Sequence, residues 1–101
     1  MHNKFCVSDG NIVLTGSTNP TNNDANLNNN NIIIINSNYL AQNYEDEFEE
    51  LWNGVYSSSD IVRYNKINTD FGIIVSYFCP EDCGISPNGG VSRIIGLIRD
   101  A

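Results

Sequence analysis

HNKFCVSDGNIVLTGSTN, residues 2–19, is the stretch that decides the fold, because it predicts a hairpin followed by a polar loop. Residues 2–8 alternate as a strand does, and Asp9-Gly10-Asn11 is typical of a hairpin turn. Residues 12–15 predict the returning strand, and residues 16–27, rich in Gly, Ser, Thr, Asn and Pro, predict a loop. The hairpin should therefore deliver that loop beside the start of the first strand.

Apolar patterning downstream predicts a third strand and a helix. Ile32-Ile33-Ile34-Ile35 is a run of β-branched residues, which favours a strand buried on both faces of a sheet covered by helices. Asn38 is a plausible N-cap for the following helix, and Gly54 suits its end. The helix carries one apolar stripe that should face the sheet, made of Leu40, Tyr44, Phe48, Leu51 and Trp52.

The rest of the chain predicts a linker, one more strand and a final helix. Residues 55–70 show no clear periodicity, residues 72–78 predict a strand, and residues 79–90 predict a loop. The spacing of Val91, Ile94, Ile95 and Ile98 predicts an amphipathic helix that runs to the chain end. The order of these elements favours an α/β fold, a mixed sheet flanked by helices.

Composition limits the classes of function. The chain has 101 residues and a net charge of -7, with five basic residues that form no cluster suited to a nucleic-acid backbone or an anionic membrane. Three cysteines do not make a disulfide framework, and Cys79-Pro-Glu-Asp-Cys83 lacks the further ligands of a usual metal site. No signal peptide or membrane-spanning stretch is visible, and the compartment stays open.

The hairpin and its loop assemble groups suited to phosphoryl transfer. His2 and Lys4 are two apart on a strand, so both should point to one face, roughly 7 Å from each other. Ser17 and Asn19 can add neutral hydrogen-bond donors to the same pocket. An imidazole can attack phosphorus, while an ammonium and an amide stabilise charge on the non-bridging oxygens.

Each of these residues alone would be an ordinary surface or turn residue, but their joint spacing is rare. Six fixed identities at fixed offsets should arise by chance in roughly one chain in a million. The stretch resembles the signature of the phospholipase D superfamily, H-x-K-x(4)-D-x(6)-G-S-x-N, and matches each of its fixed positions. The resemblance continues through residues 28–35 and into the helix ending Phe48-Glu49-Glu50-Leu51-Trp52, which covers about half of the chain.

The resemblance implies a role for each matching residue. His2 looks like the nucleophile that becomes phosphohistidine, and Lys4 and Asn19 look like the phosphate-binding pair. Ser17 looks like a supporting hydroxyl, and Asp9 completes the catalytic signature in a structural or orienting role.

The same resemblance predicts supporting groups and the cofactor requirement. Asn30 stands near the position where several nuclease-like members have a Glu that orients the histidine. An amide there could hydrogen-bond the imidazole but could not stabilise its cation as a carboxylate would. The family needs no metal and no cofactor for this chemistry.

The resemblance also predicts an incomplete phospholipase D-like fold. Residues 1–54 resemble the C-terminal half of such a domain, residues 55–70 a linker, and residues 71–101 only vaguely the start of a second repeat. Family domains place a strand-helix-strand region before the signature, whereas Met1 directly precedes it here. Met1 would then be an internal methionine or the edge of a truncated reading frame.

A second imidazole must protonate the leaving oxygen, and the chain has only His2. The resemblance thus predicts half of a phosphodiesterase site, completed by a second motif from a missing segment or a homodimer partner. Its substrate would be a nucleic acid or a phospholipid, which present the same diester. A non-catalytic scaffold on the same fold and an inactive gene fragment are the alternatives. We expect the isolated chain to show little activity and to associate through uncovered apolar surface.

Overall fold

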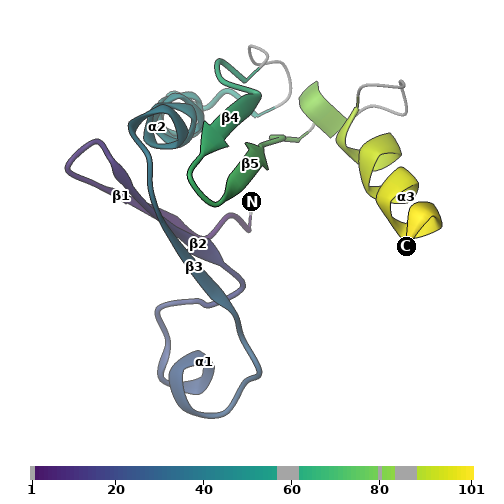
Figure 1. Cartoon of the computed structure of the whole chain (residues 1–101). Coiled ribbons are helices and arrows are strands. Elements are labelled where there is room, and N and C mark those ends of the chain that lie inside the picture. Colours follow the sequence, from purple (N-terminus) through teal and green to yellow (C-terminus); the bar gives the residue numbers. More distant parts are fainter. Residues whose placement is uncertain (1, 57–61, 80, 84–88) are drawn as a thin grey trace. The chain divides into compact units, whose positions relative to one another are not determined.

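The computed structural model describes residues 2–56, 62–79, 81–83 and 89–101, which belong to two compact units (Figure 1). Unit 1 comprises residues 1–45 and unit 2 residues 46–101. The elements in chain order are β1 (Phe5–Ser8), β2 (Ile12–Gly16), α1 (Asn22–Asn26), β3 (Ile32–Asn36), α2 (Asn38–Trp52), β4 (Lys66–Thr69), β5 (Gly72–Val75), the 3-10 helix η1 (Glu81–Cys83) and α3 (Gly90–Asp100). This mixture of helices and antiparallel sheets confirms the predicted α/β class.

The predicted N-terminal hairpin is confirmed, but its first strand begins at Phe5, so His2 and Lys4 precede the strand on which they were expected to share a face. Strands β1 and β2 pair antiparallel from Phe5 opposite Thr15 to Ser8 opposite Ile12. Asp9 and Gly10 turn the chain with φ values of 54° and 65°. Three residues, Asp9 to Asn11, join the paired Ser8 and Ile12, and the Asn11 N–H donates to the Ser8 carbonyl at 3.2 Å. Asp and Gly both tolerate the left-handed conformation that this turn requires.

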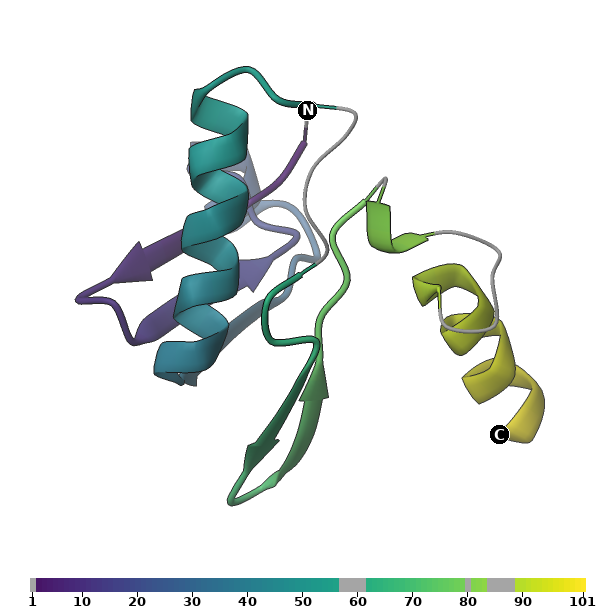
Figure 2. The same ribbon diagram turned by 90° about the horizontal axis from the view of Figure 1, so that it is seen from above.

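One face of the three-stranded sheet β1-β2-β3 carries the core of unit 1. Alternation along the paired strands places Phe5, Val7 and Val13 on this face, and the first half of α2 lies over it (Figure 2). Val13 is fully buried, together with Leu40 and Ala41 of α2. Phe5 and Val7 on the same face are half-buried.

Helix α2 begins at Asn38, the predicted N-cap, and the residue that caps it lies one position earlier. The Ser37 hydroxyl, not the Asn38 side chain, accepts the Leu40 N–H at 3.3 Å, as an N-cap does. The apolar stripe is buried only at its start, where Tyr44 packs against Phe5 with ring centroids 5.0 Å apart. Near the end of α2, Phe48 and Trp52 stack on each other and remain exposed.

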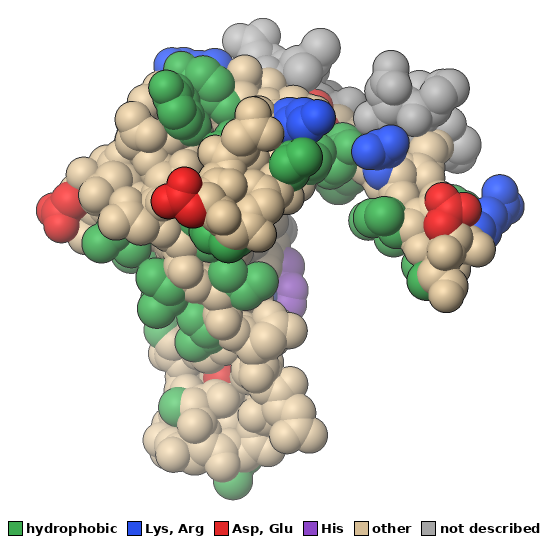
Figure 3. Space-filling view, in the orientation of Figure 1, with side chains coloured by type: hydrophobic (Ala, Val, Ile, Leu, Met, Phe, Trp, Pro, Cys, Tyr) green, Lys and Arg blue, Asp and Glu red, His purple; other side chains and the backbone are tan. Residues whose placement is uncertain are grey.

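The opposite face of the sheet is largely uncovered. Strand β3 pairs with β2 on one side only, so the expectation that Ile32–Ile35 would be buried on both faces is wrong for the described residues. Ile32 and Ile34 on this side are 51% and 66% exposed, and Ile33, which shares the face of Val13, is 54% exposed. We call this uncovered side the open face. Hydrophobic side chains gather along the sheet (Figure 3). Its apolar members are Cys6, Ile12, Leu14, Ile32 and Ile34.

The loop between β2 and β3 contains a helix that its composition did not indicate. Helix α1 spans Asn22–Asn26, and the Thr21 side chain caps it by accepting the Asp24 N–H at 3.2 Å. Asn and Asp are poor helix formers, so the cap and local side-chain bonds must hold this single turn.

Unit 2 contains a second hairpin, part of which falls inside the predicted linker. Strand β4 pairs antiparallel with β5, and Ile67 of β4 is buried. The linker prediction for residues 55–70 is thus wrong at residues 66–69, where the alternation of Lys66 to Thr69 is too short to stand out. Residues 57–61 of that linker lie outside the described residues. The structure does not test whether residues 71–101 begin a second repeat.

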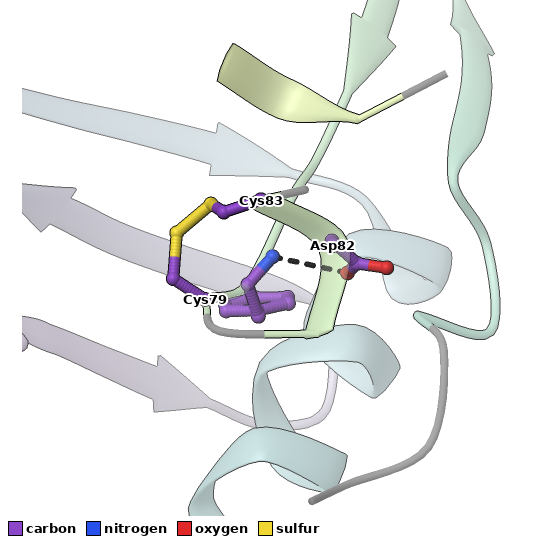
Figure 4. Close-up of a disulfide and its surroundings, with 4 residues drawn as sticks. Cys79, Asp82 and Cys83 are labelled. Atoms are coloured by element: carbon purple, nitrogen blue, oxygen red, sulfur yellow. Dashed lines mark hydrogen bonds between the residues drawn. A yellow bond between two sulfur atoms is a disulfide. The ribbon is translucent and has the colours of Figure 1, made fainter. Parts of the chain in front are cut away.

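A disulfide joins Cys79 and Cys83, with Cα atoms 5.1 Å apart (Figure 4). Beside the disulfide, the Asp82 carboxylate accepts the Phe78 N–H at 3.1 Å. With both sulfurs bonded to each other, this pair offers no thiolate to a metal. The odd cysteine, Cys6, is free and exposed. No helix in the described part of the chain combines the length and apolarity needed to cross a membrane.

Candidate active site

The hairpin brings the two ends of the phospholipase D-like signature together. Because Phe5 pairs with Thr15, Lys4 and Gly16 lie at the same end of the sheet. The Thr15 hydroxyl donates to the Lys4 carbonyl at 3.1 Å and ties the two segments to each other. The polar loop that follows Gly16 therefore begins beside Lys4, as the sequence predicts.

An open pocket of about 460 Å³ lies at this end of unit 1. It contains Lys4 and Asn19, the pair predicted to bind phosphate, whereas Ser17, also predicted to contribute to this site, is not among the lining residues. Much of its wall is apolar, and several of these side chains belong to the open face. The lining residues are Asn3, Lys4, Phe5, Cys6, Leu14, Thr18, Asn19, Pro20 and Ile32. The pocket thus offers one cation, the carboxamides of Asn3 and Asn19 and the Thr18 hydroxyl beside an apolar wall.

His2 is exposed and precedes the first strand, two residues from Lys4. The Lys4 ammonium donates to the His2 carbonyl oxygen at 2.9 Å. This bond keeps the backbone of His2 close to the cation, although His2 is not among the residues that line the pocket. The imidazole is left accessible, as an attacking group needs to be.

Asn30 was expected to hydrogen-bond the imidazole of His2, but its side chain contacts Ser17 instead. The Ser17 hydroxyl donates to the Asn30 carboxamide oxygen and accepts the Asn31 N–H, both at 3.0 Å. The Asn30 amide donates to the Asp24 carbonyl at 3.3 Å. Among the described residues, no hydrogen bond joins Asn30 to the imidazole of His2. Asn30 therefore supports the Ser17 loop, and a role on His2 stays a prediction.

Gly16 lets two backbone segments approach closely beside the site. Its φ of 155° is one that L-residues rarely adopt, and a Cβ built on it would overlap the carbonyl oxygen of Asn31. That oxygen accepts the Ser17 N–H at 3.0 Å and the Thr18 hydroxyl at 3.3 Å. The glycine of the signature is thus needed for the backbone geometry that positions Ser17.

Asp9 lies at the opposite end of the hairpin from the pocket. It occupies the β1–β2 turn, where its carboxylate accepts the Ser8 hydroxyl at 3.3 Å. Asp9 stands five positions after Lys4 in the sequence, which corresponds to about 16 Å at the rise of a strand. The structure therefore does not bring Asp9 together with His2, and its position suits the structural role better than direct catalysis.

Asp24, which the sequence did not single out, binds Asn19 through its carboxylate. One carboxylate oxygen of Asp24 accepts both the backbone N–H and the side-chain amide of Asn19, each at 2.6 Å. The other oxygen accepts the Asn28 amide, also at 2.6 Å. The bond from the Asn19 backbone, with smaller contributions from the Asn19 and Asn28 amides and the Lys4 charge, lowers the pKa of Asp24 below its ordinary value. Thr21 and Asp24, three residues apart at a helix start, were the signal that could have revealed it.

The described residues include no cluster of three or more His, Cys, Asp or Glu side chains able to hold a metal ion. Lys4 is the charged residue that lines the pocket, and its ammonium binds anions rather than cations.

Comparison with known proteins agrees with the signature. The family described as "Cardiolipin synthase, PLD-like domain" matches residues 1–52. Proteins named mitochondrial cardiolipin hydrolase from Xenopus tropicalis and Xenopus laevis are each 46% identical over 52 residues, which are 52% of this chain and 25% of theirs. The protein of that name from Chlamydomonas reinhardtii is 35% identical over 52 residues, 52% of this chain and 23% of its own length.

The matches end near the C-terminus of α2. None of the solved structures matches this chain significantly. The chain spans about a quarter of the length of the curated relatives it matches. Since the family match covers residues 1–52, the hairpin, the pocket and α2 all fall inside it, and the chain belongs to the phospholipase D-like family.

Proposed function

We propose that this chain supplies one half of the active site of a metal-independent phosphodiesterase that works through a phosphohistidine. The observation that supports it most is the pocket that unites Lys4 with Asn19 at the end of the hairpin where His2 lies. An anion held between an ammonium and a carboxamide would lie within reach of an imidazole two residues from the cation. The family match over the same residues gives independent support.

The chemistry proceeds in two displacements. In the first, the lone pair of an imidazole nitrogen of His2 forms an N–P bond while the bond from phosphorus to the leaving alcohol oxygen breaks. In the second, water attacks phosphorus and the N–P bond breaks, which returns the imidazole. Lys4 and Asn19 stabilise the negative charge on the non-bridging oxygens in both steps.

The other half of the site must deliver a proton. An alkoxide is a poor leaving group, so a second imidazole has to protonate it, and this chain has only His2. We propose that a second signature, from another segment or from a second copy of the chain, provides that acid.

A phospholipid is the substrate that the pocket favours over a nucleic acid. Leu14, Ile32 and Cys6 give the pocket an apolar wall beside Lys4, which suits a diester that carries an acyl chain. The net charge of -7 and the scattered basic residues offer little to a long polyanion. The relatives from Xenopus and Chlamydomonas are named cardiolipin hydrolases, which agrees with this choice.

Bis(p-nitrophenyl) phosphate can isolate the first step in this chain. Its leaving group departs without a proton at mildly alkaline pH, so the missing acid is not needed. We expect a burst of at most one equivalent of p-nitrophenolate per chain, a covalent adduct on His2 detected by mass spectrometry, and little further turnover. EDTA should change none of this.

Matched variants separate the proposed roles. His2→Ala should abolish the burst and the adduct, whereas Lys4→Ala and Asn19→Ala should slow adduct formation, by roughly a hundredfold or more for a lost oxyanion donor. A burst that survives in His2→Ala, or a strict need for Mg²⁺ or Zn²⁺, would overturn the mechanism. A chain that forms no adduct at all would favour a non-catalytic scaffold.

Protection from labelling tests the substrate class. A soluble short-chain phospholipid and a dinucleotide carry the same diester, and only the first has acyl chains for the apolar wall. We expect the phospholipid to slow adduct formation at lower concentration. Leu14→Asn should remove that advantage while leaving the dinucleotide unaffected. Better protection by the dinucleotide would instead assign the site to nucleic acid.

A further inference from the structure

We propose that Asp24 is a positioning residue that fixes the carboxamide of Asn19 with one N–H directed to the phosphate. This inference rests on the proposed function, because it concerns how the phosphate-binding amide is held. It assigns a role to a residue outside the six signature positions. The geometry of the loop between β2 and β3 carries it.

A single carboxylate oxygen fixes both ends of Asn19. The Oδ2 atom of Asp24 accepts the backbone N–H and the Nδ2 amide of Asn19, each at 2.6 Å. Two bonds that converge on one atom leave the Asn19 side chain little freedom to rotate. Charge-assisted bonds of this length are stronger than bonds between neutral groups.

The negative charge of Asp24 also decides which end of the carboxamide faces it. If the amide rotated by half a turn, its carbonyl oxygen would face a carboxylate that has no proton to donate. The nitrogen is therefore held at Asp24, and it has a second N–H that this bond does not use. Because Asn19 lines the pocket beside Lys4, this second N–H is available to a bound anion.

Asp24 is itself held by its surroundings. Its other carboxylate oxygen accepts the Asn28 amide at 2.6 Å, and its backbone N–H donates to the Thr21 hydroxyl at 3.2 Å. The backbone carbonyl of Asp24 accepts the Asn30 amide at 3.3 Å, and Asn30 in turn binds Ser17. A support fixed on three sides can keep an amide in one orientation, which a flexible loop could not.

Simple electrostatics predicts the opposite effect from positioning, which makes the inference testable. Asp24 is an anion close to a site for anions, so its removal should strengthen phosphate binding if it only repels the ligand. If it positions Asn19, its removal should weaken binding. Asp24→Asn removes the charge with almost no change in size, and its amide can face Asn19 with either end.

The experiment is an NMR titration of the whole chain with inorganic phosphate, following the Asn19 side-chain and backbone amide signals. We expect the wild type to shift these signals, and Asp24→Asn to weaken binding roughly tenfold, about the value of one hydrogen bond to a charged group. Asn26→Ala is the matched control, because it removes the side-chain bonds from Asn26 to Asn22 within α1 and alters no bond of Asp24 or Asn19. It should bind phosphate within about twofold of the wild type.

The double variant shows whether Asp24 acts through Asn19. If it does, Asp24→Asn combined with Asn19→Ala should bind phosphate no more weakly than Asn19→Ala alone. Additive effects, or tighter binding by Asp24→Asn, would overturn the positioning role while leaving the proposed function intact. Wild-type chain that binds no phosphate would overturn both.

Discussion

Replacing Gly16 with alanine should disrupt unit 1 at the point where the core meets the pocket. The added methyl group would have to occupy a backbone conformation with φ of 155° and would overlap the carbonyl oxygen of Asn31. Two further backbone atoms of residues 31 and 32 would lie 3.0 Å from it. Neither is the flexible end of a side chain, so β3 itself would have to move away from β2.

The cost can be assembled from its parts. A non-glycine residue held in a rarely populated conformation costs about 1–3 kcal/mol. Displacing the Asn31 carbonyl would break its bonds from the Ser17 N–H and the Thr18 hydroxyl, at about 1 kcal/mol each. We therefore expect Gly16→Ala to lower the free energy of unfolding of unit 1 by about 3–5 kcal/mol. That is a large share of the stability of an ordinary small domain, about 5–15 kcal/mol.

Gly72→Ala is the matched control for the overlap. Gly72 has a comparable φ of 144°, but a Cβ there would meet nothing within 4 Å. Gly72→Ala should therefore lose only the free energy of holding alanine in this backbone conformation. The loss should appear in the unfolding free energy of unit 2 rather than of unit 1. The gain from a stiffer unfolded chain is the same for both substitutions and cancels in the comparison.

The assay is urea unfolding followed by NMR, with amide signals of β2 reporting on unit 1 and those of β4 on unit 2. Separate reporters are needed because two compact units need not unfold together. If Gly16→Ala costs no more than Gly72→Ala, the close approach of Gly16 to Asn31 is not what the structure indicates. The argument for that glycine in the signature would then fail.

Three further predictions concern stability. Because the pKa of Asp24 is lowered in the folded state, its carboxylate stabilises the fold above the ordinary pKa of 3.8, and this contribution is lost as the pH falls through the pKa of the folded state. The difference in unfolding free energy between the wild type and Asp24→Asn should therefore become smaller in acid. A difference that grows in acid would contradict the assignment. Val13→Ala should cost about 2 kcal/mol by chemical denaturation because Val13 is fully buried, and an unchanged midpoint would refute its place in the core. Reducing the Cys79–Cys83 disulfide should cost unit 2 about 2 kcal/mol by hydrogen exchange, while equal loss in unit 1 would mean that the units are not independent.

The hairpin was predictable because its signals are local. Asp9 and Gly10 both adopt positive φ, and the sequence names two residues that tolerate it. The meeting of Lys4 with Asn19 follows from the hairpin, since antiparallel pairing returns the chain to its starting point. Where turn chemistry and alternation agree, both the fold and the position of the site could be derived from residue types.

The burial of β3 was not predictable, because it depends on neighbours that the strand does not specify. Four β-branched residues fit a strand buried on both sides, and the strand forms as expected at Ile32–Asn36. In the described residues it lies at the sheet edge with three isoleucines more than half exposed. Intrinsic preference determined the conformation, and tertiary packing determined the exposure.

Asp24 escaped the sequence analysis for a related reason. It stands in an Asn-rich loop where every residue is polar, so composition gives no member special weight. Its importance arises from three bonds of 2.6 Å that form only when the turn of α1 closes on Asn19. Local polar networks of this kind depend on distances that residue types alone do not set.

The register of β1 couples the core of unit 1 to its pocket. Phe5 packs against Tyr44 of α2, and Lys4, the residue before it, lines the pocket together with open-face side chains such as Leu14. Because side chains alternate along a strand, a slip of one residue would turn Phe5 outward and direct Lys4 towards the core. The free energy of burying Phe5 therefore also opposes any arrangement that removes Lys4 from the phosphate. The same packing that stabilises the sheet thus places the cation, and the two cannot be varied independently.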